Sequence, residues 1–334
     1  MMSSPLVSVI VLNYNGKHYL DECLSSLIKQ TYHNFEVIFI DNGSTDNSID
    51  FIEKNYSNFV KLVKNPINYG FAKGNNIGIQ ASRGKYIVTL NNDTKVEECW
   101  LEELVKSANS NEQIGMCASK IYLMRMEKTI DSVGMLIYPD GSSKQRSWLE
   151  KDIGQYDKQE DVLLPSACAA LYRRRMLDEI GLFDEDFFAY CEDTDLGLRG
   201  RLAGWKCVFV PRAIVYHHYS GTAGKYSNLK AFLVERNHWW VAVKNFPLFM
   251  LFISPFYAFM RMIFQVYSIF NFSSKSIKKG HLYVIIIKAY LAVFFSLVYT
   301  LKKRKRINKK VSDSEIYSWF RKYKLRIRDL ALKE

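Results

Sequence analysis

The sequence predicts an α/β protein, with a mostly parallel sheet flanked by helices and a helical region after it. Three observations lead to this prediction. Runs of β-branched apolar residues recur in the first third of the chain, which is typical of strands buried on both faces of a parallel sheet. Segments with leucine and isoleucine at helical spacing lie between these runs, so strand and helix alternate. Two long apolar stretches follow at 248–270 and 281–301.

The composition permits one large domain or two ordinary ones, since 48% of the 334 residues are hydrophobic. We place a boundary between a globular domain at 1–247 and a membrane-associated helical region with a basic tail at 248–334. The N-terminus lacks the basic start and cleavage site of a signal peptide. The cysteines, which show no paired short spacing, are Cys23, Cys99, Cys117, Cys168, Cys191 and Cys207. We therefore expect reduced thiols in a cytosolic globular domain.

The opening of the chain predicts two strands and two helices. The run "LVSVIVLN" predicts a buried strand whose polar end, Asn13 to Gly16, emerges at the carboxyl edge of the sheet. A segment with leucines at helical spacing follows at 17–30. The run "FEVIFID" predicts the second strand, and Ser44, Thr45 or Asp46 is expected to cap the next helix. This alternation indicates a right-handed, doubly wound layer.

The sheet is expected to continue with two more strands. The runs "FVKLVKN" and "KYIVTLNND" predict them, and the glycine-rich segment at 70–84 between them predicts a turn and a helix. Another helix is expected at 99–111. In open sheets of this kind, ligands bind at the carboxyl ends of the strands. Those ends carry Asn13, Asp41 and Asn91 to Asp93.

The pattern changes after Ile114 to shorter runs, which predict an added, partly antiparallel segment of the same domain. The run at 204–218 predicts a further strand that ends at His217 and His218. A helix is expected at 228–246, since Pro247 cannot continue it.

The two C-terminal apolar stretches are each long enough to suggest a transmembrane helix. Polar side chains fall on one helical face of the first and form a rougher stripe on the second, and Pro255 interrupts the first. Such stripes favour helices that lie in the membrane interface, or enter it and return, over helices that span it. The polar residues are Ser254, Arg261, Gln265 and Ser268, then His281, Lys288, Ser296 and Thr300.

A basic tail accounts for most of the net charge of +12. From Lys302 to Glu334 the chain has 13 Lys or Arg and 4 Asp or Glu, a balance of +9. Because this tail follows apolar helices rather than glycines interleaved with aromatic residues, it favours a membrane surface over nucleic acid as its partner.

Two common nucleotide-binding motifs are absent from the sequence. No G-x-G-x-x-G follows the first strand and no G-x-x-x-x-G-K-[ST] occurs, which argues against a dinucleotide dehydrogenase and a P-loop phosphotransferase. The strand ends instead carry "DNGSTD" at 41–46 and "LNNDT" at 90–94, which could hold a nucleoside and a divalent cation. A single such tip would more often cap a helix or close a turn. Three tips on one edge favour a binding site.

Six segments occur in the order found in family 2 glycosyltransferases: "VSVIVLNYNG", "DNGSTD", "NYGFAKGNN", "LNNDT", "GLFDEDFFAYCEDTDLGLRGRLAGW" and "VYHHYSGT". Over roughly residues 6–247 the chain resembles the rhamnosyltransferase-like subgroup of that family. The agreement of six separated segments makes this resemblance specific, whereas "LNND" alone would be weak. It implies the GT-A fold, in which a nucleotide-binding α/β sheet is fused to an acceptor-binding half.

The resemblance also implies which residues bind the donor. Asp41 would accept a hydrogen bond from the imide N–H of a pyrimidine, in a base and ribose pocket shared with Asn13 and Tyr14. Gly70 and Gly74 would let the backbone approach the nucleotide; the alternative is a plain glycine-rich turn. Arg236 could reach diphosphate oxygens or pair with Glu235. The donor-binding residues expected are Asn13, Tyr14, Asp41, Gly70, Gly74, Asn75, Asn91, Asn92 and Arg236.

The tip "LNNDT" takes the place of the D-x-D motif of the family, with Asn91 where the first aspartate often stands and Asp93 as the expected metal ligand. This departure removes one negative charge, which is expected to loosen metal binding. The resemblance makes His217 the second ligand or a diphosphate contact, with His218 as the alternative. The expected cofactor is Mg²⁺ or Mn²⁺.

Transfer of a sugar with inversion needs a base that takes the proton of the acceptor hydroxyl. The resemblance assigns this role to Asp193 of "CEDTD", with Glu192 as the alternative. Asp195 is expected to cap the helix that follows or to pair with Arg199, one turn on.

Together these features predict an inverting, metal-dependent glycosyltransferase that uses a dTDP- or UDP-sugar, for which the resemblance suggests rhamnose. The expected acceptor is a glycan or lipid-linked saccharide in cell-surface polysaccharide assembly. The protein should be attached, peripherally or monotopically, to the cytoplasmic face of the cell membrane. The alternatives are a membrane-anchored nucleotide- or glycan-binding scaffold without activity, and a sugar nucleotidyltransferase, for which "NYNGKHYL" is a poor triphosphate loop.

Overall fold

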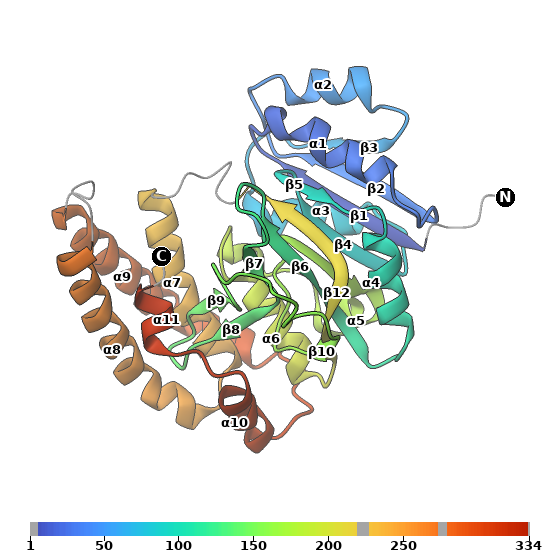
Figure 1. Cartoon of the computed structure of the whole chain (residues 1–334). Helices are drawn as coiled ribbons and strands as arrows, with labels where there is room; N and C mark the ends of the chain where they lie inside the picture. The colour runs from blue at the N-terminus through green and yellow to red at the C-terminus, as the bar shows by residue number, and fades with distance from the viewer. Residues whose placement is uncertain (1–5, 219–226, 273–278, 333–334) are drawn as a thin grey trace.

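The computed structural model describes residues 6–218, 227–272 and 279–332, and in these a ten-stranded mixed sheet forms the centre of the molecule (Figure 1). The strand order is β10-β12-β6-β11-β4-β1-β2-β3, with β5 paired to β12 and β7 paired to β6. The strands of this sheet are β1 (Val7–Asn13), β2 (Phe35–Asp41), β3 (Val60–Lys64), β4 (Tyr86–Asn91), β5 (Thr94–Val96), β6 (Ile114–Leu123), β7 (Ile130–Ser132), β10 (Glu160–Asp161), β11 (Ala169–Arg173) and β12 (Lys206–His217).

The first half of the sheet is the parallel, doubly wound layer that the sequence predicts. Strand β1 lies between β2 and β4 and runs parallel to both, and β3 continues the layer beyond β2. The central strands are buried on both faces, which explains their continuous apolar runs. The register sets Asn13 beside Asp41, so the polar strand ends meet at one edge.

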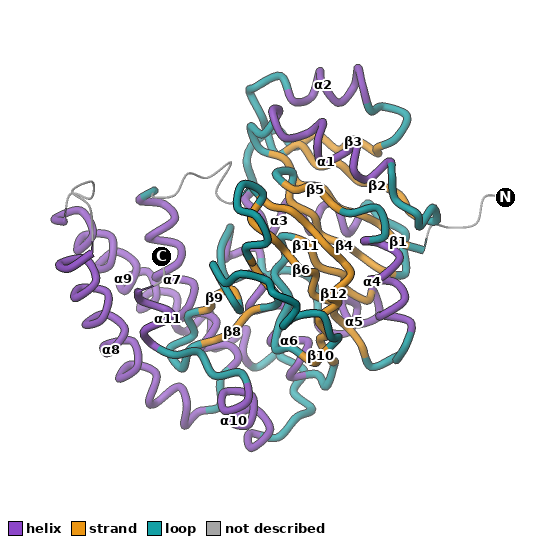
Figure 2. Tube along the Cα trace, viewed as in Figure 1, coloured by secondary structure: helices purple, strands orange, loops and turns teal. Residues whose placement is uncertain are grey.

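Helices cover both faces of this layer (Figure 2). The apolar side chains of the strands alternate between two cores, one packed under α1 and α4 and the other under α3 and α5. The helices are α1 (Lys17–Ile28), α2 (Ser48–Asn55), α3 (Gly70–Gln80), α4 (Trp100–Asn109), α5 (Arg174–Ile180) and α6 (Glu192–Leu202), with a short 3₁₀ helix η1 (Glu185–Phe187).

The second half contains the added antiparallel segment that the sequence predicts. Strand β11 runs antiparallel to both β4 and β6, and β12 runs antiparallel to β5. The pairing of β12 with β5 sets His217 opposite Thr94, beside the tip of β4. A separate hairpin consists of β8 (Met135–Ile137) and β9 (Ser143–Gln145).

The C-terminal helices share a core with the sheet domain. These helices are α7 (Asn228–Asn245), α8 (Leu248–Phe272), α9 (Lys279–Arg304), α10 (Asp313–Lys322) and α11 (Ile327–Leu332). Ile316 and Trp319 of α10 belong to the same buried cluster as Phe187 and Leu198 of the sheet domain. Residues on the two sides of position 247 thus share one core. The domain boundary at this position stays a prediction.

The polar stripe of α8 faces the protein rather than water. Ser254 and Arg261 are buried, and the side chains of Gln265, Ser268 and His281 lie outside those described. Arg261 donates to Asp140 at 2.6 Å and to Glu235 at 2.7 Å. Of the predicted stripe, Ser254 and Arg261 thus have protein partners, whereas the apolar side chain of Phe252 on the same helix is exposed.

Candidate functional site

A network of amide and carboxylate side chains closes the carboxyl edge of the parallel strands. The Nδ2 group of Asn13 donates to Asp41 and to Ser44, each at 3.1 Å. Asn92 donates to Oδ1 of Asn13 at 2.6 Å. The structure thus brings Asn13, Asp41 and Asn92 together, as the sequence predicts. Tyr14, the residue after Asn13, is 40% exposed.

Sequence reasoning missed Asn42, which ties this edge to the following loop. Its side-chain amide donates to Asn68 at 2.9 Å and to the carbonyl of Gly70 at 3.1 Å, and its oxygen accepts from Asn65 at 3.0 Å. Asn42 is 1% exposed. The only feature of the sequence that points to Asn42 is its position next to Asp41. Every polar residue of that segment could close a turn, so this position does not distinguish Asn42 from its neighbours.

The glycines of "NYGFAKGNN" pack closely against other residues of the protein. A Cβ atom on Gly70, whose φ is +80°, would lie 2.5 Å from the carbonyl oxygen of Phe188, and one on Gly74 would lie 2.5 Å from Leu12. Asn75 donates to the carbonyl of Phe71 at 2.9 Å. The tight packing explains both glycines without a ligand, so their role in donor binding stays a prediction.

Asp93 and His217 meet beside the tip of β4. Nε2 of His217 lies 3.3 Å from Oδ1 of Asp93, and both side chains are buried. On the other side of the ring, Nδ1 lies 2.6 Å from Oδ2 of Asp131. Asp131, on β7, is 3% exposed, and its Oδ1 has no hydrogen-bond partner among the described residues. Sequence reasoning missed Asp131, because "TIDSVG" matches no ligand spacing.

His218 points away from this pair. Its Nε2 lies 2.9 Å from the carboxylate of Glu22, and its ring lies against Tyr19 at a centroid distance of 4.9 Å. The backbone N–H of His218 donates to the carbonyl of Asp93 at 3.0 Å, which fixes the strand end. The geometry therefore favours His217 over His218. The remainder of "VYHHYSGT", from Tyr219 on, lies outside the described residues.

The charges around His217 favour a cation. Burial raises the pKa of Asp93, but the hydrogen bond and the charge of His217, with smaller contributions from the backbone and His218, together hold the pKa below its usual value. Burial lowers the pKa of His217, but Cys168, Asp131 and Asp93 together raise it well above its usual value. Asp93 and Asp131 thus stabilise positive charge on this imidazole, and a divalent cation would bind Asp93 and the neutral ring in place of the Nε2 proton.

A divalent cation fits this donor set with help from a ligand. Within the described part of the chain, no group of three His, Cys, Asp or Glu side chains is arranged to hold a metal alone. Asp93 supplies a carboxylate oxygen and His217 an imidazole nitrogen, which leaves positions for diphosphate oxygens. Mg²⁺ and Mn²⁺ are commonly bound in this way, through one or two protein groups plus phosphate.

Asp193 and Glu192, at the start of α6, have different surroundings. Asp193 is partly exposed and accepts from the N–H groups of Ala167 at 3.2 Å and Thr194 at 2.7 Å. Glu192 is 5% exposed, and its Oε2 has no partner among the described residues. Burial raises the pKa of Asp193 and, with the charge of Asp193, raises that of Glu192 well above its usual value. Of the two carboxylates, that of Asp193 is the more exposed to solvent and the one that ionises more readily.

A two-residue segment, Ala167 and Cys168, connects the acidic pair with the strand edge. The N–H of Ala167 donates to Asp193, and the carbonyl of Cys168 accepts from the N–H of Asn91 at 2.8 Å. The Cys168 thiol also interacts with the ring of His217. Asp193 and the Asp93–His217 pair therefore lie on the same edge of the sheet, separated by this segment.

Asp195 has a structural role, as the sequence predicts. It is fully buried and accepts from Nε of Arg199 at 2.8 Å, one turn along α6. Lys244 lies 2.7 Å from its other oxygen, and these two cations hold the pKa of Asp195 below its usual value despite burial. Of the two roles considered, pairing with Arg199 is confirmed.

Arg236 contacts the backbone before the acidic pair. Its NH2 group donates to the carbonyls of Asp186 at 3.1 Å and Phe187 at 3.2 Å, and its guanidinium lies 4.1 Å from the ring centroid of Trp240. The alternative of pairing with Glu235 is wrong, because Glu235 binds Arg261. These contacts use part of the guanidinium, and a role on the diphosphate stays a prediction.

The backbone that leads to Asp193 is strained. Phe188, Tyr190 and Cys191 have φ angles of +63°, +68° and +66°, in the region that favours glycine. Each such residue costs about 1–3 kcal/mol and persists only where its surroundings enforce it. Strain of this kind concentrates at functional sites.

Comparison with known proteins agrees with this geometry. Residues 8–181 match the family described as Glycosyl transferase family 2. An uncharacterized glycosyltransferase of Haemophilus influenzae is 35% identical over 231 residues, which cover 66% of this chain and 68% of that protein. An N-acetylglucosaminyl-diphospho-decaprenol L-rhamnosyltransferase of Mycobacterium tuberculosis is 30% identical over 275 residues, or 71% of this chain and 87% of that protein.

A solved structure shares the fold. The mannosyltransferase PcManGT from Pyrobaculum calidifontis, in complex with GDP-Man and Mn²⁺, matches with a TM-score of 0.53 and 14% identity, over 92% of this chain and 86% of that one. At this identity the likeness shows the fold alone. The expected GT-A fold is confirmed.

Proposed function

The chain belongs to glycosyl transferase family 2, and on this premise we propose that it is an inverting, metal-dependent transferase that moves a sugar from a nucleoside diphosphate to a hydroxyl group. One observation supports this most. Asp193 and the Asp93–His217 pair lie on the same sheet edge, separated by Ala167 and Cys168. Inversion needs a base on the face of the sugar opposite the leaving diphosphate. In this arrangement Asp193 would be the base, and the Asp93–His217 pair would bind the cation at the diphosphate.

Asp193 is the base in this proposal. It takes the proton of the acceptor hydroxyl as the new glycosidic bond forms and the bond to the diphosphate breaks. Burial raises the pKa of Asp193, which makes its carboxylate a stronger base than an exposed one. Glu192 is less suited, because it is buried and its pKa lies well above its usual value.

Asp93 and His217 would hold the divalent cation, with Asp131 orienting the imidazole. The cation, when bound, neutralises charge on the leaving nucleoside diphosphate. Asp131 accepts from Nδ1 of His217, which directs Nε2 toward Asp93. Asn91 and Asn92 complete the tip of β4, where Asn92 holds Asn13.

A pyrimidine nucleotide and a deoxyhexose are the proposed donor groups. Asp41 is fully buried and accepts one internal hydrogen bond on each oxygen, and in this proposal a remaining lone pair accepts from a base imide N–H once the nucleotide is bound. Tyr14 is exposed enough to stack on that base. The mycobacterial relative, named as an L-rhamnosyltransferase for a decaprenol-linked sugar, supports rhamnose and a lipid-linked acceptor.

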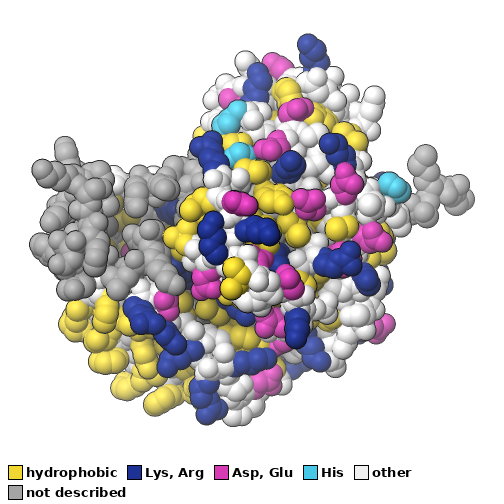
Figure 3. All heavy atoms as spheres, viewed as in Figure 1, with side chains coloured by type: hydrophobic (Ala, Val, Ile, Leu, Met, Phe, Trp, Pro, Cys, Tyr) yellow, Lys and Arg dark blue, Asp and Glu magenta, His cyan; other side chains and the backbone are white. Residues whose placement is uncertain are grey.

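The proposed acceptor would be met at a membrane surface. Val284–Arg304, within α9, is the one stretch among the described residues that is long and apolar enough to cross a bilayer. Apolar side chains also gather at the lower left in Figure 3, where α8 lies in Figure 1. On α8, Phe252 is 83% exposed. Because Ser254 and Arg261 of α8 are buried against the protein while its apolar side chains are exposed, we infer that α8 and α9 lie against a membrane surface. Its cytoplasmic face is the one that we propose.

A donor panel tests the function. Membranes that contain the full chain are incubated with UDP-, dTDP- and GDP-sugars, with Mg²⁺ or Mn²⁺ and then with chelator, and release of the nucleotide is measured. Metal-dependent release from one pyrimidine donor, lost in Asp193→Asn, is the expected result. Binding of nucleotide without release from any donor would favour the inactive scaffold, and release from GDP-sugars alone would overturn the pyrimidine assignment.

A further inference from the structure

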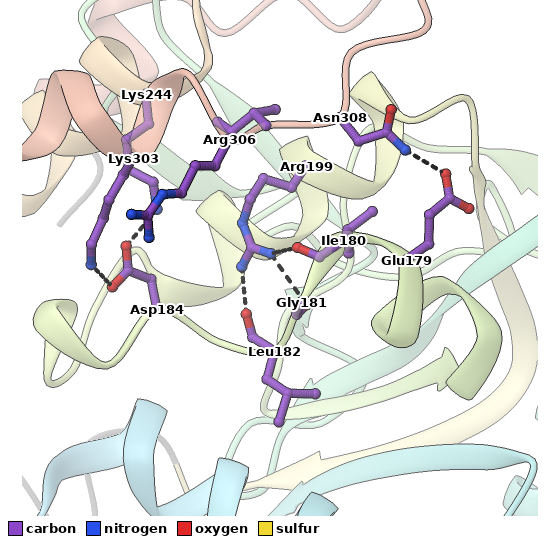
Figure 4. A pocket seen from close by; sticks show the side chains of 11 residues that line it. Glu179, Ile180, Gly181, Leu182, Asp184, Arg199, Lys244, Lys303, Arg306 and Asn308 are labelled. Carbon is purple, nitrogen blue, oxygen red and sulfur yellow. Dashed lines mark hydrogen bonds and ion pairs between the residues drawn. The ribbon is translucent and has the colours of Figure 1, made fainter.

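The segment 187–191 must be held in place by its neighbours, because three of its residues with side chains have positive φ angles. Its entry is anchored by Asp184, which accepts from Lys244 at 2.7 Å and from Lys303. These residues line a cavity of about 220 Å³ on a part of the molecule that shares no residue with the strand edge (Figure 4). The anchor fixes where the segment begins, but not its conformation.

Asn237 of α7 supplies the contacts that determine the conformation. Its Nδ2 group donates to the carbonyls of Phe187 at 3.0 Å, Ala189 at 2.9 Å and Tyr190 at 2.7 Å. The residue is fully buried. Its Oδ1 accepts from Nε of Arg236 at 2.9 Å, which turns the amide so that its donors face the segment.

The helix α3 holds the segment from the opposite side. The carbonyl of Phe188, which Asn237 does not contact, accepts from the N–H groups of Phe71 at 2.6 Å and Ala72 at 3.1 Å in the first turn of α3. Gly70 lets the segment approach this closely. Between them, α7 and α3 bind the four consecutive carbonyls of 187–190, and only Cys191 separates these residues from Glu192 and Asp193.

We propose that Asn237 is a positioning residue for the transfer reaction: it holds segment 187–191 in the conformation that places Asp193 at the strand edge. The proposal rests on the role of Asp193 as the base under the proposed function. Without the amide, the carbonyls of Ala189 and Tyr190 lose the donor that Asn237 supplies, while that of Phe187 keeps the hydrogen bond from Arg236. The strained residues can then relax toward ordinary backbone angles. The start of α6 then turns, and the carboxylate of Asp193 leaves its place beside Ala167.

The test compares Asn237→Ala and Asn237→Asp with Val241→Ala in the full chain. Asn237→Asp keeps the volume of the side chain but replaces its donors with acceptors. Val241, also fully buried on α7 and in the same apolar cluster as Phe187, is the control for a loss of packing that removes none of the hydrogen bonds to the segment. Amide hydrogen exchange of 71–72 and 187–193 reports the segment, thermal unfolding reports stability, and kcat and donor KM are measured with the donor that the panel identifies.

Both Asn237 variants should exchange faster than wild type at 71–72 and 187–193. They should lose about 10²-fold in kcat, the order of loss that a displacement of about 1 Å can cause, with donor KM within about threefold. Val241→Ala, with a comparable loss of stability, should change neither exchange there nor kcat by more than about threefold.

Exchange no faster than in Val241→Ala would overturn the proposal, as would faster exchange with an unchanged kcat. A failure of the proposed function is distinguishable, because wild type would then release no nucleotide from any donor. The exchange comparison would in that case still decide whether Asn237 holds the segment.

Discussion

Nδ1 of His217 lies 2.6 Å from a carboxylate oxygen of Asp131, on the side of the ring opposite Asp93. A carboxylate in this position fixes the orientation of an imidazole and increases its strength as a ligand. The geometry thus connects β7, which belongs to the added antiparallel segment, with the tip of β4.

Asp131→Ala should weaken Mn²⁺ binding by about 10- to 100-fold, the usual effect of removing such a partner. Mn²⁺ binding is followed by electron paramagnetic resonance in the presence of nucleoside diphosphate. Asp152→Ala is the matched control, since Asp152 is a buried carboxylate of the same segment that pairs instead with Lys120 at 2.8 Å. Equal affinity in Asp131→Ala and the control would argue against the assignment.

Asp193→Asn should lower kcat by about 10²- to 10⁴-fold, because it removes the base while preserving the shape of the side chain. Nucleotide affinity, measured by calorimetry, should stay within about twofold, since general base catalysis contributes to the transition state and not to donor binding. Glu192→Gln, a change of the same kind at the neighbouring position, should keep most of the activity. The reverse pattern would make Glu192 the base.

The rate should depend on pH through Asp193. Because burial raises the pKa of Asp193, its carboxylate is protonated at a higher pH than an exposed aspartate, for which the pKa is about 3.9. A profile of kcat/KM against pH should therefore fall on the acid side with an apparent pKa above that value. An acid limb at or below the usual aspartate pKa would contradict the burial argument.

Glu192→Gln should stabilise the protein increasingly as pH rises. Burial raises the pKa of Glu192 well above its usual value, so the folded state binds the proton more tightly than the unfolded state. The stabilising contribution is complete below the unfolded pKa of about 4.3 and is lost as pH rises through the folded pKa. Glutamine mimics the protonated acid at every pH.

Thermal unfolding at about pH 5 and about pH 8 measures this effect as a widening gap between Glu192→Gln and wild type. The exposed Glu127, changed to glutamine, is the control and should show no widening. A gap of the same size at both pH values would show that Glu192 does not titrate between them.

Phe252→Asp combined with Phe295→Asp should weaken binding to vesicles of anionic phospholipid by at least about tenfold. These side chains, on α8 and α9, are 83% and 79% exposed, and each buried aromatic side chain contributes about 1.5–3 kcal/mol. Flotation of the full chain with vesicles measures the binding. Ile153→Asp, at an apolar residue that is 87% exposed on the sheet domain, should bind as wild type does. Equal loss in both would exclude a specific membrane face.

Periodicity predicts the parallel half of the fold well, because β-branched runs and helical spacing reflect burial that is local in the sequence. The strand-end residues Asn13, Asp41 and Asn92 could be predicted for the same reason, since parallel strands bring their carboxyl ends to one edge. For the other half, only the presence of an antiparallel segment could be predicted. Its strand pairings could not, because they join segments that are distant in the sequence.

The residues that sequence reasoning missed depend on such distant pairings. Asp131 reaches His217 only because β7 pairs with β6, and β6 with β12. Asn237 reaches the segment before Asp193 only because α7 packs on α6. For Ser254 and Arg261 the stripe on α8 was visible, but a stripe does not specify whether its partner is water or protein.

The core shared by α10, α7 and the sheet domain has a consequence for which hydroxyl groups can react. Met250 of α8 belongs to the same buried cluster as Leu198, so within the described residues α8 packs against the domain that contains the helix beginning at Glu192. A protein attached through α8 and α9 would therefore carry its base at a constant height above the lipid. The distance of an acceptor hydroxyl from the membrane, as well as the shape of the sugar, would then determine which position of a membrane-anchored chain is glycosylated.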